Sequence, residues 1–289
     1  MFTRSFGILC VLGLTSGCAS SPSHSPSHRH LGDAVLLAPA RSAAPDPYYR
    51  VGPAPSADYR PFTKSMSVYG LDFIGSDEIR DGFMEKVADV VVEIFPRTPD
   101  MDGGLQRQLL QNLHRHRTTI PFFDGEPEMR PSDEAAWEKL AMENSICDII
   151  MQDVDGQIME VVEHILHHVS DVGLHYTFPD EWGLSRDSVL WAAMQEAIEA
   201  GYYDVAQYAD MREAPEVYDR VLLQEFAYWI ITCAWDLQAP YGPEESEWSG
   251  IRTPAELKAK LPRSMELIRG TLDRVMVPPQ KATLEAFNS

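Results

Sequence analysis

The chain has few positive charges. Its 289 residues include 24 Lys and Arg against 44 Asp and Glu, which gives a formal net charge of −20 at pH 7. Nucleic acids and anionic membrane surfaces attract clusters of Lys and Arg, so this balance argues against both as partners. The remaining composition, 44% hydrophobic with 6 Trp, is sufficient for a large buried core.

Cysteine is also scarce, with 4 residues in the whole chain. Cys10 and Cys18 lie in the N-terminal segment, which leaves Cys147 and Cys233 for the folded part. A single pair can form one disulfide in an oxidising compartment, but two buried free cysteines are equally ordinary. The sequence leaves both alternatives open.

Long hydrophobic runs are missing too. The apolar stretch near the N-terminus is too short to span a bilayer as a helix. Arg4 precedes this stretch at residues 6–14, an arrangement typical of a secretory signal peptide. Residues 14–18, LTSGC, resemble the lipobox of bacterial lipoproteins, in which the cysteine is lipidated and becomes the new N-terminus. We therefore expect residues 1–18 to be a lipoprotein signal peptide and Cys18 to anchor the chain to a membrane. An ordinary signal peptide or an uncleaved anchor is the alternative.

The residues that follow the lipobox bear on location and organisation. Ala19, rather than Asp, is similar to the sorting signal of outer-membrane lipoproteins, which implies a bacterial envelope protein facing the periplasm or the cell surface. Residues 19–62 are rich in Ser, Pro, Ala, His and Gly, and such a composition buries too little surface to fold. We expect a flexible tether there and a single globular domain at 63–289.

The apolar pattern of this domain predicts an α+β fold. Its N-terminal half alternates strands with helices around a small sheet, and its C-terminal half is mainly helical. A capping box at Thr253 predicts the start of a late helix, and Pro262 is expected to break it. The expected strands are 66–74, 119–123 and 146–151, and the other expected helices are 76–95, 105–117, 133–143, 185–200 and 214–237.

The rest of the domain is organised around a further predicted helix at 153–173. Apolar residues recur there every three or four positions and fill one arc of the helix. Gly173 is expected to close the helix in the left-handed conformation. The remaining arc carries Glu160, Glu163, His164, His167, His168 and Asp171.

The chemistry of this polar face favours a metal site. It contains three imidazoles and three carboxylates and neither Lys nor Arg. These are the ligands that zinc or iron prefers, and residues four apart lie on the same side of a helix. Glu163 with His167, or His164 with His168, could therefore share one ion. The alternative is a solvated face, or histidines hydrogen-bonded to neighbouring acids.

The helix resembles the active-site helix of the zincin metallopeptidases, whose signature is His-Glu-x-x-His. In the gluzincin branch, which includes anthrax lethal factor-like domains, a Glu on a later helix is the third zinc ligand. Glu225, within the apolar run LQEFAYW at 223–229, matches that role. The resemblance implies a central zincin-like helix pair with zinc held by Glu163, His167 and Glu225. Further candidate site residues are Glu160, His168 and Asp171.

The signature is altered, however. EHILH at 163–167 places a glutamate at the first ligand position and His164, the candidate catalytic residue, at the position of the general base. A frame shifted by one residue places Ile165 there. The chain is also similar, over about residues 65–240, to exported bacterial lipoproteins of no known activity that carry Glu-His-x-x-His. The resemblance implies a metal-binding envelope lipoprotein with weak or absent catalysis. An active zinc peptidase or hydrolase and a purely structural or interaction lipoprotein are the alternatives, and no protein or peptide partner is indicated.

Overall fold

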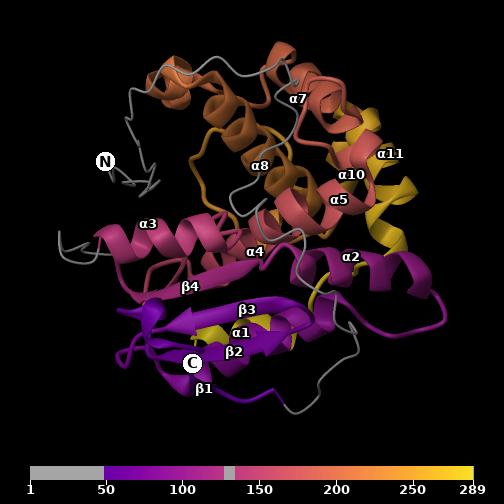
Figure 1. The fold of residues 1–289 in the computed structure, drawn as a ribbon. Coiled ribbons are helices and arrows are strands. Elements are labelled where there is room, and N and C mark those ends of the chain that lie inside the picture. Colours follow the sequence, from indigo (N-terminus) through magenta and orange to yellow (C-terminus); the bar gives the residue numbers. More distant parts are fainter. Residues whose placement is uncertain (1–48, 127–133, 289) are drawn as a thin grey trace.

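The computed structural model describes residues 49–126 and 134–288. A five-stranded mixed sheet comes from the N-terminal half, and the C-terminal half is almost entirely helical (Figure 1). The predicted α+β class is therefore confirmed. The strands are β1 (Gly52–Pro53), β2 (Lys64–Val68), β3 (Leu71–Gly75), β4 (Thr119–Asp124) and β5 (Ile150–Gln152).

The sheet follows the order β1-β2-β3-β4-β5. The first three strands are antiparallel, and β3, β4 and β5 are parallel. The single strand predicted at 66–74 is wrong, because these residues form the β2–β3 hairpin. The alternating pattern continues across a tight turn in which Tyr69 and Gly70 have φ values of 51° and 94°. A Cβ at Gly70 would also lie 2.6 Å from the carbonyl oxygen of Leu110, so the turn requires glycine.

The helices agree with the predicted ones except at their ends. The capping box at Thr253 is present, with Glu256 bonding back to the Thr253 backbone, and a new helix starts at Pro262. The longer helices are α1 (Asp81–Ile94), α2 (Gly103–Arg115), α3 (Glu134–Glu143), α4 (Gln157–His168), α7 (Val189–Glu199), α8 (Pro215–Ala234), α10 (Pro254–Lys260) and α11 (Pro262–Gly270). The short ones are η2 (Ala57–Tyr59), α5 (His175–Thr177), α6 (Pro179–Trp182), η4 (Ala206–Glu213), α9 (Gln238–Tyr241), η5 (Leu272–Arg274), α12 (Lys281–Glu285) and η6 (Ala286–Asn288).

The two faces of the sheet enter different apolar clusters, because successive side chains of a strand point to opposite faces. Phe73 and Phe122 belong to the main core, which α1, α4 and the C-terminal helices complete. Ile74 and Phe123 instead contact a smaller cluster with Trp137 of α3. The C-terminal helices thus share a core with the Phe73 and Phe122 face of the sheet, and Figure 1 shows them above strand β4.

The folded part begins earlier than predicted. Strand β1 pairs with β2, and Phe62 is buried in the smaller cluster. The tether boundary at residue 62 is therefore wrong for residues 49–62. The prediction used the average composition of 19–62, in which polar and small residues dominate. It therefore did not take account of Tyr59 and Phe62 near the end, which pack in the smaller cluster. The signal peptide, Cys18 and the rest of the tether lie outside the described residues.

The central helix does not end at Gly173, so the predicted closing role of this glycine is wrong. Helix α4 continues through a π-helix, η3 (Val169–Leu174), into α5. Gly173 lies against α2, where a Cβ would be 2.9 Å from Cδ2 of Leu109. The glycine therefore permits close packing of η3 on α2. Such π-helical turns occur frequently at functional sites.

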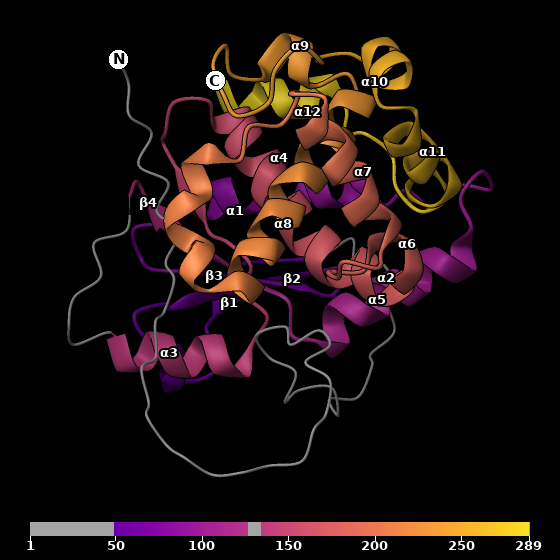
Figure 2. The same cartoon turned by 90° about the horizontal axis from the view of Figure 1, so that it is seen from above.

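Helices α4 and α8 pack against each other near the centre of the molecule (Figures 1 and 2). Residues 221–233 of α8 are buried without interruption, because α4, α7, α10 and α11 surround this helix. In the part of the chain that the structure describes, no helix combines the length and hydropathy needed to cross a membrane. The apolar side chains of α8 are buried by packing against other helices of the domain.

Candidate metal centre

Three side chains converge where α4 meets α8. Glu163 and His167 lie one turn apart on α4, and Glu225 faces them from α8. One ligand atom from each lies within 4.8 Å of the other two. The structure thus brings together the three residues that the sequence indicated as metal ligands.

Two facing atoms of this group are buried without a partner. His167 and Glu225 are 0% and 4% exposed, and the ring of Tyr228 packs edge-on against His167. Among the described residues, neither Nε2 of His167 nor Oε2 of Glu225 has a hydrogen-bond partner, although the two atoms are 3.6 Å apart. A buried polar atom left unpaired costs on the order of 1–3 kcal/mol, and more if it is charged.

The spacing of these atoms fits a metal ion. Two ligand atoms on one tetrahedral zinc ion, each about 2.1 Å from the metal, lie about 3.4 Å apart. The observed 3.6 Å between His167 Nε2 and Glu225 Oε2 is close to that separation. Glu163 is partly exposed, so the group also reaches solvent on one side. The residues therefore fit a cation between the two helices.

A second group shares His167 and includes Asp148, which was not among the predicted site residues. Asp148 lies in the loop before β5, with Oδ2 2.9 Å from Nδ1 of His167 and 3.6 Å from Nε2 of His164. Asp148, His164 and His167 are also close enough to hold a cation. The sequence does contain a sign of this residue, because its carboxylate interrupts the apolar run ICDIIM at 146–151. The whole run was predicted to be a strand, but β5 begins only at Ile150.

Electrostatics link the members of the two groups. Burial by itself would lower the pKa of His167, but Glu225 and Asp148 outweigh it and raise that pKa well above its usual value. Burial and the charge of Glu225 raise the pKa of Glu163. Burial would raise the pKa of Asp148, yet His164 and His167 hold it below its usual range. The carboxylates of the cluster therefore favour positive charge on the two histidines.

His164 lies between two carboxylates. Its Nδ1 is 3.1 Å from Oε1 of Glu160, and its Nε2 faces Asp148. Burial opposes protonation, but Asp148 and Glu160 raise the pKa of His164 to about 9. In the metal-free chain the ring therefore favours its protonated form, in which it cannot act as a general base. Glu160 is further engaged, because Oε1 accepts the backbone N–H of Met151 at 2.8 Å.

His168 has a structural role, because both of its ring nitrogens bond to backbone groups. Its Nδ1 donates to the carbonyl oxygen of His164 at 2.7 Å, and its Nε2 accepts backbone N–H groups of Cys147 and Asp148 at 3.1 and 3.4 Å. Burial lowers its pKa to about 4, which keeps Nε2 free of a proton so that it can accept. His168 thus ties the loop before β5 to α4 and leaves no nitrogen for a metal.

Asp171, the remaining candidate, lies on η3 and is fully buried. Its Oδ2 accepts from Arg220 of α8 at 3.3 Å, and Arg220 also donates to Gln224 at 3.0 Å. Burial raises the pKa of Asp171 to about 6 in spite of Arg220. Among the described residues, the two groups with metal-binding spacing include none of Glu160, His168 and Asp171.

The cysteines left open by the sequence are free thiols in the described part of the chain. Cys147 is partly buried next to the cluster, and Cys233 is buried on α8. Burial raises the pKa of Cys233 to about 12, so its thiol stays protonated and unreactive. Neither cysteine takes part in a disulfide here.

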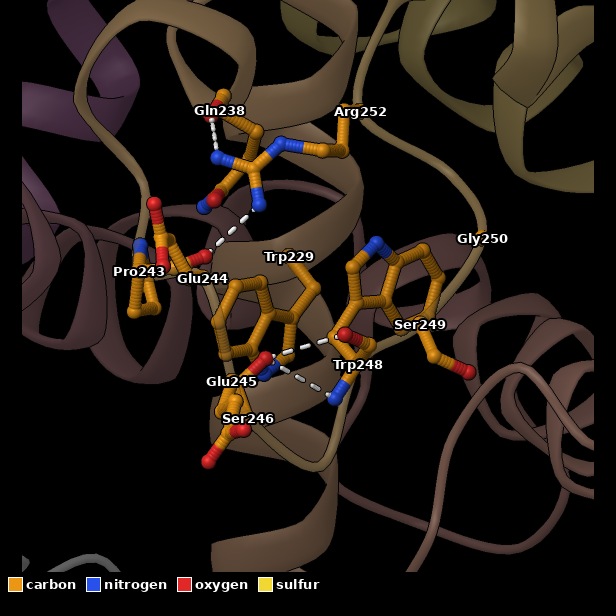
Figure 3. Close-up of a pocket in the computed structure, with 10 residues that line it drawn as sticks. All are labelled: Trp229, Gln238, Pro243, Glu244, Glu245, Ser246, Trp248, Ser249, Gly250 and Arg252. Atoms are coloured by element: carbon orange, nitrogen blue, oxygen red, sulfur yellow. Dashed lines mark hydrogen bonds between the residues drawn. The ribbon is translucent and has the colours of Figure 1, made fainter. Parts of the chain in front are cut away.

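A surface pocket of ≈ 260 Å³ shares no lining residue with the cluster, and Figure 3 shows the residues around it. Trp229 and Trp248 stack in its wall, with their rings 6.1 Å apart. The guanidinium of Arg252 donates to the backbone carbonyls of Gln238, Gly242 and Pro243. This cation therefore stabilises the loop around the pocket.

A scan against protein-family models matches none of them, and searches of curated proteins and of solved structures likewise give no match. Fold and site together define an α+β protein with a buried imidazole–carboxylate cluster that could hold a metal ion. The finer interpretation therefore depends on the geometry of this cluster.

Proposed function

We propose that the chain is an envelope lipoprotein whose zincin-like domain binds zinc through Glu163, His167 and Glu225 and has weak or no catalytic activity. The pair of facing, unpartnered atoms on His167 and Glu225 is the observation that carries this proposal. A bound cation would satisfy both atoms at once, because each of them can give it a lone pair.

The donor set supports zinc among the metals. One imidazole nitrogen and two carboxylates suit a borderline cation and exclude a soft metal that needs thiolates. Few ligands can reach an ion held between two packed helices, which favours the low coordination number of zinc. Three protein ligands leave a fourth position for water or a partner group.

The altered signature supports binding rather than peptidase activity. In a zincin, a glutamate beside the first ligand takes a proton from the attacking water. His164 stands at that position here, and its neighbours Asp148 and Glu160 raise its pKa to about 9. In the metal-free chain the ring therefore favours its protonated form, which makes it a poorer proton acceptor than the glutamate it replaces.

A metal-dependent hydrolase is the second candidate. The open fourth position favours it, because a bound metal lowers the pKa of coordinated water towards 7 without a separate base. Partial exposure of Glu163 and Asp148 places this side of the cluster within reach of solvent. Zinc-dependent cleavage of casein or of a peptide mixture, absent after chelation and in Glu225→Gln, would establish this candidate.

The test of the main proposal is metal analysis of the purified mature chain. We expect about one zinc ion per chain after exposure to zinc, lost on prolonged chelation. His167→Gln and Glu225→Gln should remove it, while His116→Gln, which changes a buried histidine away from the cluster, should retain it. A wild-type chain without stoichiometric metal would contradict the proposal.

The lipoprotein part rests on residues 4–18 and has its own test. Mass spectrometry of the membrane-extracted protein should find an acylated N-terminus at Cys18. Cys18→Ala should release the chain from the membrane or block its processing. Unchanged processing and membrane retention in this variant would contradict a lipid anchor at Cys18.

A further inference from the structure

The ring of His167 has two polar neighbours that require opposite positions of its proton. Oδ2 of Asp148 lies 2.9 Å from Nδ1, and a carboxylate can only accept, so this contact needs a proton on Nδ1. Nε2 of Gln224 lies 3.1 Å from the same Nδ1 and can only donate, so this contact needs a lone pair there. The orientation of Gln224 is fixed because its Oε1 accepts from Arg220.

The contact with Asp148 is the stronger of the two. A hydrogen bond to a charged acceptor is roughly twice as strong as a neutral one. With the proton on Nδ1, the lone pair of a neutral ring lies on Nε2, the atom that faces Glu225. With the proton moved to Nε2, that lone pair is lost and the ring cannot bind a metal on this side.

The carboxylate of Asp148 is itself held in place. Its Oδ1 accepts the backbone N–H of Ile149 at 2.8 Å, which leaves Oδ2 for His167. The backbone N–H groups of Asp148 and Cys147 bond to Nε2 of His168. His168, which follows His167 on α4, thus fixes the loop whose Asp148 orients His167.

We propose that Asp148 is a positioning residue that keeps the proton of His167 on Nδ1 and so directs Nε2 towards the metal position between Glu163 and Glu225. This inference rests on the proposed zinc site. Residues that bond to the second nitrogen of a metal-binding histidine commonly change metal affinity by about 10- to 100-fold when mutated. Gln224 is the competitor whose influence Asp148 overcomes.

The first experiment compares zinc affinities of purified chains by calorimetry with a competing chelator. Asp148→Asn should weaken zinc binding about 10- to 100-fold, because the charge that fixes the proton is lost and Gln224 can then donate to Nδ1. Asp124→Asn is the matched control, since Asp124 ends the neighbouring strand and accepts from Gln152, away from the cluster. Its zinc affinity should equal that of the wild type.

A second variant distinguishes positioning from a general loss of structure. Adding Gln224→Met to Asp148→Asn removes the competing donor, so the double variant should recover much of the lost affinity. A merely structural role of Asp148 predicts no such recovery. Equal affinity of Asp148→Asn and wild type, or no recovery in the double variant, would overturn the inference.

Nitrogen NMR of the zinc-loaded wild type tests the inference without any variant. The expected spectrum has a proton on Nδ1 of His167 and the metal-shifted signal on Nε2. The opposite assignment would place the ion with Asp148 and His164 and make Asp148 a direct ligand, which overturns positioning while zinc binding stands. A wild-type chain that binds no zinc would overturn the proposed function and this inference together.

Discussion

Two buried glutamates near α8 differ in what surrounds them. Oε1 of Glu247 accepts from Nε1 of Trp229 at 2.9 Å and from the hydroxyl of Tyr208 at 3.3 Å. Glu225 is buried to a similar degree, 4% exposed against 8% for Glu247, yet its Oε2 has no partner among the described residues. Burial alone therefore does not mark a functional carboxylate. What distinguishes Glu225 is an unsatisfied oxygen that also faces an unpartnered nitrogen, Nε2 of His167, so that one added group such as an ion could satisfy both atoms.

The largest effect expected from this comparison is on the response to zinc. A ligand that binds only the native state adds RT ln(1 + [L]/Kd), about 4 kcal/mol at a thousandfold excess over Kd. We expect this gain in the wild type and in Glu247→Gln, and its loss in Glu225→Gln, measured as urea unfolding with zinc against chelator. Equal zinc responses in both variants would show that Glu225 is not a required ligand.

A second contrast divides the adjacent histidines of α4. Both nitrogens of His168 are engaged by backbone groups, whereas Nε2 of His167 is unpartnered among the described residues. In the metal-free chain, His168→Leu should lower the free energy of unfolding by about 3 kcal/mol, because the N–H groups of Cys147 and Asp148 lose their acceptor.

His168→Gln is the control for this prediction, since its amide oxygen can accept in place of Nε2. Its loss in urea unfolding should be smaller than that of the leucine variant. Equal losses in the two variants would mean that packing, and not these hydrogen bonds, explains the role of His168.

These contrasts also show what the sequence could and could not predict. The convergence of Glu163 and His167 follows from helical spacing, and Glu225 stood out as a carboxylate in an apolar run. The roles of His167 and His168 could not be separated, because they depend on the loop that contains Asp148. Its position beside α4 results from the parallel β4–β5 pairing and from the bonds to His168, which are contacts between distant parts of the sequence. The predicted helix end at Gly173 was wrong because of another contact between distant residues. This glycine permits close packing against Leu109, and the helix continues beyond it.

His116, a buried histidine outside the cluster, is expected to make the stability of the chain depend on pH. His116 is 2% exposed and stacks on Tyr176 with ring centres 3.7 Å apart. Burial, with a smaller contribution from Arg115, lowers the pKa of His116 to about 4 from the ordinary 6.5. Below pH 6.5 the unfolded chain therefore binds a proton that the native chain does not, so stability falls as the pH is lowered to about 4.

The expected contribution of His116 is a loss of about 2 to 3 kcal/mol between pH 7 and pH 4.5. His116→Phe keeps an aromatic ring against Tyr176 and removes the titrating group, so its stability should fall less over this range. Urea unfolding with chelator at both pH values measures the difference. Identical pH dependence in the variant and the wild type would show that this histidine is not kept neutral by burial.

The smallest expected effect belongs to Glu247. In Glu247→Gln the side chain keeps one oxygen that can accept from Trp229, but the bonds lose the strength that the negative charge gives them. The variant no longer buries a charge, which offsets part of this loss, so we expect a decrease of about 1 kcal/mol in the free energy of unfolding at pH 7. The decrease should be the same with zinc and with chelator, because Glu247 belongs to neither group with metal-binding spacing. A loss that changes when zinc is added would mean that the two glutamates act on one site, and the contrast between them would no longer identify Glu225 as the ligand.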